Sequence, residues 1–117
     1  MSGQVRQVIF HTPGKAWVQG LNVLAQPGVS EHFAYIKVLH ERGDVIAAGP
    51  FVDAQSGGML VLHERLSAED AAAIVRKDPG VASGLVEFQI RAWLITVAAQ
   101  EAPASLIALE RSPLQGV

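Results

Sequence analysis

The sequence predicts one α+β domain whose elements follow the order strand, helix, strand, strand, helix, strand. Short segments rich in β-branched and aromatic residues predict the strands, and two segments with helical spacing of apolar residues predict the helices. Glycine, proline and capping residues separate these segments. A length of 117 residues suits a single core, and 50% hydrophobic against 17% charged residues excludes a disordered chain.

The first half of the chain supplies a strand, a long loop and a helix. Residues Val5 to His11 form the first predicted strand. The segment from Thr12 to Gly28 contains two prolines and three glycines, so it is predicted to be a loop, of a length that is often functional. Ser30 is a suitable cap for the first helix, which we expect to end near Arg42, at Gly43.

Two strands follow this helix and are predicted to pair. The segment 44–51 is the second strand, broken at Gly49-Pro50, and Gly57-Gly58 opens the third strand, at 59–64. Because the second strand runs back toward the end of the sheet where the first one finishes, the Gly-Pro break should lie at that end.

The second helix is predicted over residues 67–77. Ser67 and Asp70 have the spacing of a capping box at its start. Pro79 should end it, because the residue before a proline is pushed out of the helical region. The last strand then runs from Leu85 to about Val97. We divide the chain into a domain at 1–99 and a C-terminal extension at 100–117, which could be a short helix or an arm that reaches a partner subunit.

Right-handed connections between these elements give a four-stranded antiparallel sheet of ferredoxin-like topology, with both helices on one face. The last strand has apolar residues on both of its faces, so both faces of the sheet should be covered. The helices cover one, and a second copy of the chain is the economical cover for the other. We therefore expect a homodimer formed through the sheet face. The residues on the two faces of the strand are Phe88, Ile90 and Leu94, and Leu85, Trp93 and Ile95.

Composition excludes several classes of protein. The chain has no cysteine, so disulfides, thiolate metal sites and a cysteine nucleophile are excluded. The net charge is −2 and the basic residues are scattered, which argues against nucleic acid. The third strand also lacks the aromatic residues that RNA-binding domains of this topology carry. With neither a signal peptide nor an apolar run long enough to cross a membrane, we expect a cytoplasmic protein with no membrane partner.

His32 and Asp78 are the candidate catalytic residues. His32 is the first position of the apolar stripe on the first helix, and Asp78 is the last position of the stripe on the second. The topology brings both positions to the end of the sheet where the first strand finishes. The positive end of a helix dipole favours a neutral imidazole, which can accept a proton, and a carboxylate can orient that ring. The alternative is structural, because Asp-Pro commonly ends helices and a histidine near a helix start can simply be a satisfied polar residue.

Other residues near this end are candidates for binding a substrate, each with a structural alternative. Trp17 could stack on a planar ligand or anchor the loop, and Tyr35 could line a pocket or fill space. Arg91 could hold an anion or lie in solvent at a strand edge. The full set of substrate-binding candidates is Trp17, Tyr35, Gly49, Pro50, Phe51, Gly58 and Arg91.

A metal site is not expected from the histidine spacing. His11 ends the first strand at one end of the sheet, whereas His63 lies toward the other end of the third strand, so the two should be far apart. His40 falls on the outer flank of the first helix. With no cysteine and no His-x-x-x-His pair, we predict no metal ligands.

These residues and their order resemble the YCII-related (YciI-like) proteins. The matching strings are EHFAYIKVLHERGDVIAAGPF, SGGMLVL, the Asp78-Pro79 step and SGLVEFQIRAWLI. The resemblance implies a dimeric α+β barrel and a site built around His32 and Asp78. Two positions depart from the pattern. Gly80 stands where a large residue is expected, and Arg91-Ala92-Trp93 replaces Arg-Pro followed by an aromatic residue.

Two functions are consistent with this sequence. The first is a small-molecule enzyme that uses His32 and Asp78 for proton transfer without a cofactor, as a lyase or isomerase. The wider superfamily contains isomerases, lyases and monooxygenases that act on aromatic or lactone-like compounds, which is the origin of this suggestion. The alternative is a non-catalytic module that binds a small ligand or regulates through the same pocket. A purely structural dimer would fill the pocket with side chains.

Overall fold

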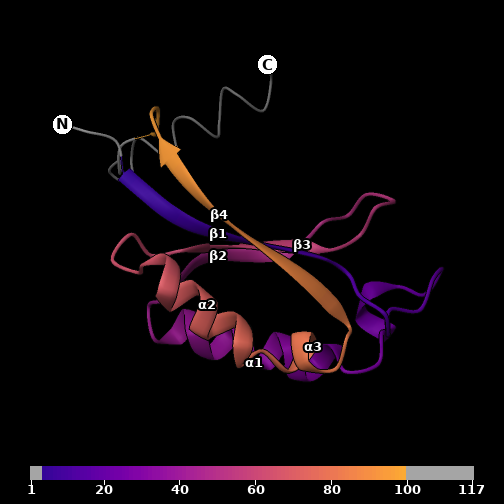
Figure 1. The fold of residues 1–117 in the computed structure, drawn as a ribbon. Helices are drawn as coiled ribbons and strands as arrows, with labels where there is room; N and C mark the ends of the chain where they lie inside the picture. The colour runs from indigo at the N-terminus through magenta and orange to yellow at the C-terminus, as the bar shows by residue number, and fades with distance from the viewer. Residues whose placement is uncertain (1–3, 100–117) are drawn as a thin grey trace, which may run out of the picture.

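A computed structural model describes residues 4–99, and they form a ferredoxin-like α+β fold (Figure 1). The sheet is antiparallel with the order β2-β3-β1-β4, and the helices all lie on one of its faces. This confirms the predicted order of elements. The strands are β1 (Gln4–Pro13), β2 (Val45–Pro50), β3 (Gly58–Leu62) and β4 (Val86–Ile95); the helices are the 3-10 turn η1 (Val23–Ala25), α1 (Val29–Glu41), α2 (Ala68–Arg76) and α3 (Pro79–Ala82). The predicted C-terminal extension lies outside the described residues.

The helix boundaries differ from the prediction at two points. Gly28, not Ser30, occupies the N-cap position of α1, with a left-handed φ of 82° and no side-chain cap. The Ser30 hydroxyl donates instead to Glu31 Oε1. The short helix α3 was not predicted, because Pro79 ends α2 but then serves as the first residue of the next helix, a position that proline favours. The capping box of Ser67 and Asp70 at the start of α2 is confirmed.

The predicted break at Gly49-Pro50 is wrong. Strand β2 continues through both residues, with Gly49 opposite Met59 and Pro50 opposite Gly58. Proline is tolerated there because β2 is an edge strand, which needs no N–H donor on its outer side. The turn follows instead, over residues 51–57.

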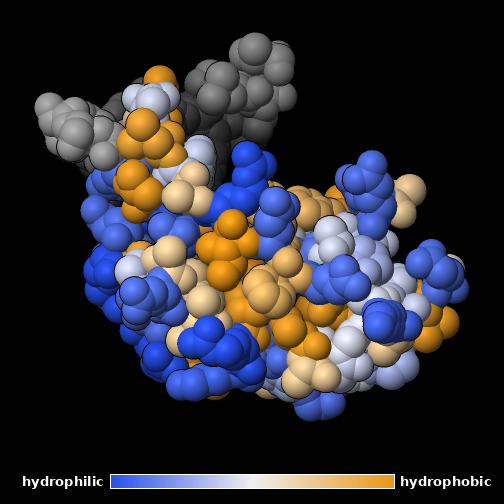
Figure 2. All heavy atoms as spheres, in the orientation of Figure 1, coloured by the Kyte–Doolittle hydropathy of each residue, from blue (hydrophilic) through white to orange (hydrophobic). Residues whose placement is uncertain are grey.

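The core between the sheet and the helices is centred on β1. Ile9 on β1 and Leu62 on β3 are fully buried against Leu39 of α1 and Val75 of α2. A smaller apolar cluster of Val29, Leu85 and Val86 lies where the long loop returns to α1. Figure 2 shows apolar residues gathered between β4 and the helical layer.

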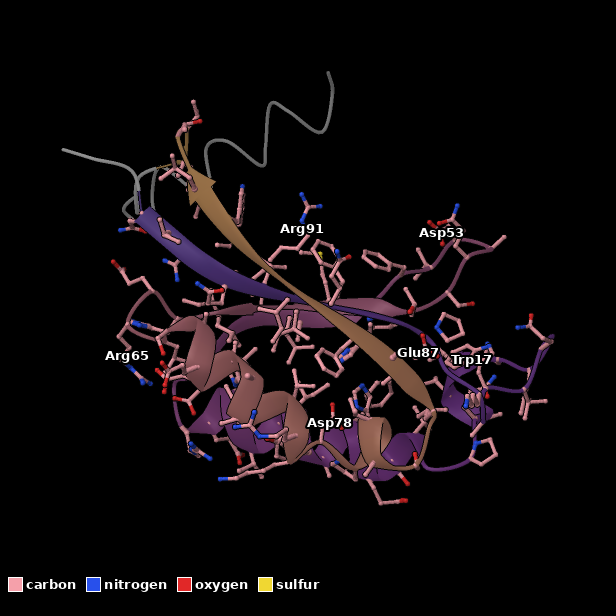
Figure 3. All side chains as sticks on the ribbon, in the orientation of Figure 1. Trp17, Asp53, Arg65, Asp78, Glu87 and Arg91 are labelled. Carbon is pink, nitrogen blue, oxygen red and sulfur yellow. The ribbon has the colours of Figure 1, made fainter. Side chains whose placement is uncertain are left out.

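Within residues 4–99, no helix covers the outer face of the sheet. Val8 and Phe10 alternate along β1 with the core residue Ile9, so they point to this face, and Arg91 lies opposite Val8. Figure 3 shows Arg91 on the side of the sheet away from the helices. A depression of about 250 Å³ lies here, lined by Val8, Phe10, Met59, Arg91, Ala92 and Trp93. None of the helices within residues 4–99 has the length and apolar run that a bilayer crossing requires.

Candidate functional site

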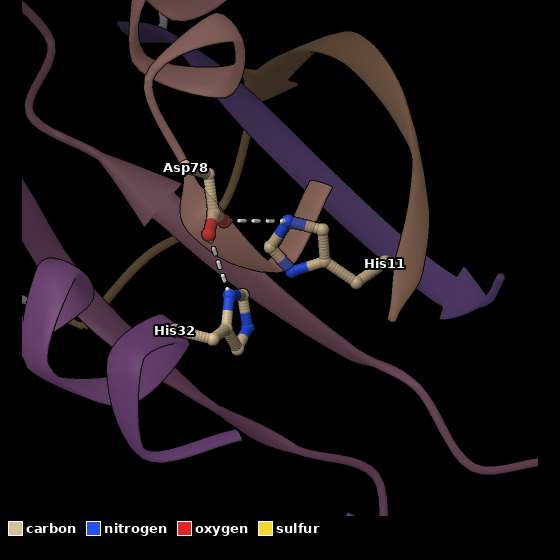
Figure 4. Close-up of side chains that lie close together, drawn as sticks. All are labelled: His11, His32 and Asp78. Carbon is tan, nitrogen blue, oxygen red and sulfur yellow. Dashed lines mark hydrogen bonds and ion pairs between the residues drawn. The ribbon is translucent and has the colours of Figure 1, made fainter. Parts of the chain in front are cut away.

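Three buried polar side chains from distant parts of the chain meet beneath the sheet (Figure 4). His11 comes from β1, His32 from the first turn of α1, and Asp78 from the junction between α2 and α3. His32 Nδ1 is 2.8 Å from Asp78 Oδ1, and His11 Nε2 is 3.7 Å from Asp78 Oδ2. The structure thus brings the predicted pair together and adds a second histidine.

Asp78 is held in place by backbone geometry as well as by His32. It is the N-cap of α3, and its Oδ1 accepts the Gly80 N–H at 2.7 Å. A carboxylate can only accept hydrogen bonds, so His32 Nδ1 must donate to it. Nε2 of a neutral His32 ring then carries a lone pair. Within the described residues, no fully buried side-chain nitrogen lacks a partner, so Nε2 is accessible in a residue that lines a cavity.

Gly80 lets the His32 ring approach this capping turn. A Cβ atom added at Gly80 would lie 2.5 Å from His32 Nδ1 and 2.8 Å from Cγ, well inside van der Waals contact. The sequence pattern of the resembling family predicts a large residue at this position. The glycine found here leaves the space that the imidazole occupies, so it acts through its contact with His32, and it is not among the residues that line the cavity.

His11 is the residue that sequence reasoning missed. The sequence predicts His11 in the first strand, which continues two residues beyond it to Pro13, and the histidine spacing relates it only to His63. The available signal was the strand alternation, because His11 is two residues beyond Ile9 and therefore on the helix-facing side. Burial and, to a smaller extent, the neighbouring His32 lower the pKa of His11 to about 4, against a raising effect of Asp78. His11 is therefore neutral at pH 7, and its ring stands edge-on to His32 with the centroids 5.0 Å apart.

The two histidines line a cavity of about 300 Å³ between α1 and the β2–β3 edge of the sheet. Its inner wall is buried and includes His11, His32 and Leu60, whereas Lys37 and Pro50 are exposed and mark its mouth. Most of its surface is apolar. The lining residues are His11, Trp17, Val23, Val29, His32, Phe33, Ile36, Lys37, Ala48, Gly49, Pro50, Gly57, Gly58, Met59, Leu60, Leu85 and Val86.

Four of the predicted substrate-binding residues line this cavity: Trp17, Gly49, Pro50 and Gly58. The other three do not reach it. Tyr35 packs against the main core and its hydroxyl donates to the Ile74 carbonyl, Phe51 lies exposed in the turn after β2, and Arg91 points to the outer face of the sheet. Tyr35 shares the helix stripe of His32, but α2 covers its position.

Trp17 anchors the loop, as one of the two interpretations predicts, and its place in the cavity wall leaves stacking on a ligand as a prediction. It lines the cavity, and it also packs against the cluster of Val29, Leu85 and Val86. The loop around it is fixed by the buried side chain of Gln26, whose amide donates to the Val18 and Leu21 carbonyls and accepts the Val18 N–H. This loop wall is therefore preformed.

The same three side chains offer ligand atoms to a metal ion. The candidate donor atoms of His11, His32 and Asp78 all lie within 4.8 Å of one another, although no metal was expected from the sequence. Two ligands about 2.0–2.1 Å from a zinc ion in a tetrahedral site are roughly 3.3 Å apart. His32 Nδ1 and Asp78 Oδ1 are closer than this, at 2.8 Å, as befits a direct hydrogen bond. The side chains are thus arranged to share a proton, and they would have to separate to hold a metal.

The fold and the site define a small α+β domain with a histidine–aspartate pair at the inner wall of a ligand-sized cavity. A family model for the YCII-related domain matches residues 10–94, so the chain belongs to this family. The uncharacterized protein YjpA of Bacillus subtilis (strain 168) is 37% identical over 68 residues, which cover 58% of this chain and 78% of that relative. No solved structure matches the chain.

Proposed function

We propose that this protein is a small-molecule enzyme that transfers a proton without a cofactor, in an elimination or an isomerisation. The observation that carries this proposal is the 2.8 Å hydrogen bond between His32 and Asp78 at the wall of an apolar cavity. A buried histidine–carboxylate pair costs desolvation free energy, and its position against an open cavity suits it to chemistry.

In this mechanism His32 Nε2 is the general base. It removes a proton from the substrate, and the Asp78 carboxylate stabilises the imidazolium that forms while Nδ1 keeps its hydrogen bond. In an isomerisation the proton returns to another atom of the substrate. In an elimination it leaves with the departing group or passes to solvent.

His11 has a different part in the proposal. Because its pKa is lowered to about 4, the ring stays neutral and does not compete with His32 for the proton. A neutral imidazole keeps one N–H group, and with this hydrogen on Nδ1, the nitrogen that is not the one facing Asp78, His11 would donate a hydrogen bond to negative charge that develops on the substrate. The two rings would thus divide the roles of base and electrostatic stabiliser.

We also propose that a second copy of the chain covers the outer face of the sheet. The support is the apolar character of that face around Phe10, Met59 and Trp93, where Trp93 is 47% exposed. Analytical ultracentrifugation should find a dimer that Trp93→Glu weakens. A wild-type protein that sediments as a monomer at micromolar concentration would refute this part.

The experiment for the chemistry has two stages. Thermal stabilisation against a library of small aromatic and lactone compounds identifies ligands, since a ligand of the folded state raises its apparent stability. Each ligand is then incubated with the enzyme in D₂O, and exchange of its C–H protons and any product are followed by NMR. Wild-type protein should catalyse exchange or conversion, and His32→Gln should abolish it.

His40→Gln is the matched control, because His40 lies exposed on the same helix. It should keep the wild-type rate. Ligands that bind wild-type protein but neither exchange nor react would favour the alternative, a non-catalytic binding or regulatory module. Full turnover by His32→Gln would refute the role of His32 as the base.

A further inference from the structure

The cavity carries one feature that proton transfer does not require, a lysine at its mouth. Lys37 is exposed and lines the cavity. Among the described residues that line the cavity, Lys37 is the one whose side chain carries a fixed charge. The remaining lining is apolar apart from the two histidines. A lone cation beside an apolar cavity is the arrangement that selects a ligand with one negative charge and an apolar body.

The position of Lys37 on α1 separates it from His32 along the helix axis. Lys37 is five residues beyond His32, and five residues of α-helix rise about 7.5 Å. Phe33 and Ile36 lie between them on the same cavity wall. A ligand that reaches both ends therefore needs a flat or ring-shaped apolar part between its reacting atom and its anionic group.

Lys37 is also available to such a ligand. Within residues 4–99 the carboxylates contact Arg6, Arg42 and Arg65 as ion pairs and His11 and His32 through ring nitrogens, and Lys37 takes part in none of these contacts. Glu41 is one helical turn away, but exposed charges on one helix interact weakly. The ammonium group is thus free to meet a charge at the mouth.

We infer that the cavity binds a small monoanionic compound, such as a cyclic or aromatic carboxylate, with the apolar body inside and the carboxylate at Lys37. Where the compound is a substrate, this inference rests on the proposed function, but the binding itself does not. A cavity of about 300 Å³ lies at the small end of the range for ligand pockets, roughly 300–1,000 Å³, which limits the body to about one ring and a short chain.

Equilibrium binding of matched probes tests this inference. Benzoate, phenylacetate and 3-phenylpropanoate are each compared with the corresponding neutral amide, and dissociation constants are measured by NMR titration of the full chain. At least one acid should bind about three- to fivefold more tightly than its amide, as expected for one charge pair at an exposed position. This preference should shrink as salt is added.

Three variants complete the test. Lys37→Met should remove the preference for the acid and leave the affinity for the amide unchanged, which also shows that the variant is folded. Lys37→Arg should restore the preference, and Lys15→Met, an exposed lysine outside the cavity lining, should keep it. Equal binding of acids and amides by wild-type protein, an unchanged preference in Lys37→Met, or no binding of any acid would overturn the inference.

The outcome is separable from that of the proposed function. If the preference depends on Lys37 but no anionic ligand exchanges protons in D₂O, the ligand class stands and the catalytic proposal fails. If proton exchange occurs only with neutral ligands and is insensitive to Lys37→Met, the catalytic proposal stands and the anionic ligand class fails.

Discussion

Two buried aspartates, Asp44 and Asp78, lie at different places in the molecule and have opposite kinds of partners. The Asp44 carboxylate contacts Arg65 at 2.6 Å and Arg42 at 2.8 Å, and both arginine side chains are at least half exposed. Among the residues that the structure describes, the Asp78 carboxylate has only buried polar partners, the two histidines and the Gly80 N–H. Figure 3 shows Arg65 at the end of the molecule opposite to Trp17, with Asp78 between them.

This difference separates a structural carboxylate from one suited to chemistry. Arginine is always protonated, so the Asp44 cluster holds fixed charges that join the end of α1 to the segment after β3. An imidazole can both accept and donate a proton, and the two histidines of the Asp78 cluster line a cavity from which a proton could come. Burial of a carboxylate alone therefore says little about function, whereas the partner and the adjacent space say more.

The largest contrast is expected in catalysis. Asp78→Asn should slow the proton exchange of an identified substrate by about 10²–10⁴-fold, because the amide does not stabilise the imidazolium of His32. Asp44→Asn should leave the rate within about twofold. Proton exchange in D₂O measures both, and equal losses in the two variants would erase the distinction between the clusters.

The pH dependence of stability should report His11. Its pKa is lowered from 6.5 to about 4 in the folded protein. Between these pH values the unfolded chain binds a proton that the folded chain does not, so the free energy of unfolding falls as the pH drops from 6.5 toward 4, by about 3 kcal/mol at most. Urea unfolding at several pH values measures this slope.

His11→Gln should flatten that slope whatever its own stability at pH 7. His40→Gln, on the exposed flank of α1, should keep the wild-type slope. If His11→Gln retained the full pH dependence, the buried neutral imidazole would not be its source.

Gly80→Ala tests the close approach at the Asp78 cluster. Alanine normally suits a helix better than glycine, but here its Cβ would meet the His32 ring at 2.5 Å. We expect a loss of about 1–3 kcal/mol in the free energy of unfolding, as for overpacked sites, and weaker ligand binding. Gly49→Ala in the same cavity wall is the control, since nothing lies within 4 Å of its added Cβ. Equal effects of the two changes would count against the claim that Gly80 is needed for the close approach of the His32 ring.

The smallest effect is expected at the Asp44 cluster. Arg65→Gln removes one ion pair whose arginine is 50% exposed, and Asp44 keeps its contact with Arg42. The free energy of unfolding should fall by no more than about 1 kcal/mol, and the difference should shrink in high salt. A loss above about 3 kcal/mol in the free energy of unfolding would show that the Asp44 cluster contributes as much to stability as the Asp78 cluster.

The sequence was sufficient for the order of elements and for the His32–Asp78 pair, because both depend on periodicity and topology. The α1 stripe and the Asp-Pro step place these residues at one end of the sheet without any knowledge of packing. Gly80 and α3 were not predictable in the same way, since the role of Gly80 depends on close packing against the distant His32 ring and α3 depends on proline acting as a helix start. Tyr35 was placed on the correct stripe, but sequence alone does not show that α2 covers it.

His11 shows most clearly what the sequence alone does not predict. Strand alternation gave its direction, yet only the pairing of β1 with β3 and β4 puts it beside the two residues that the helices supply. The spacing of histidines along the sequence therefore does not reveal this cluster, whose three residues come together only in the folded protein.

The tautomer of His32 tests the central claim most directly. Ring ¹⁵N chemical shifts, measured by NMR near pH 8 on the wild-type protein, distinguish a protonated nitrogen from a bare one. The account predicts hydrogen on Nδ1, directed at Asp78, and an unprotonated Nε2 that responds when ligand enters the cavity, with Asp78→Asn weakening the preference. A ring protonated on Nε2, or one unchanged by ligand and by Asp78→Asn, would contradict it.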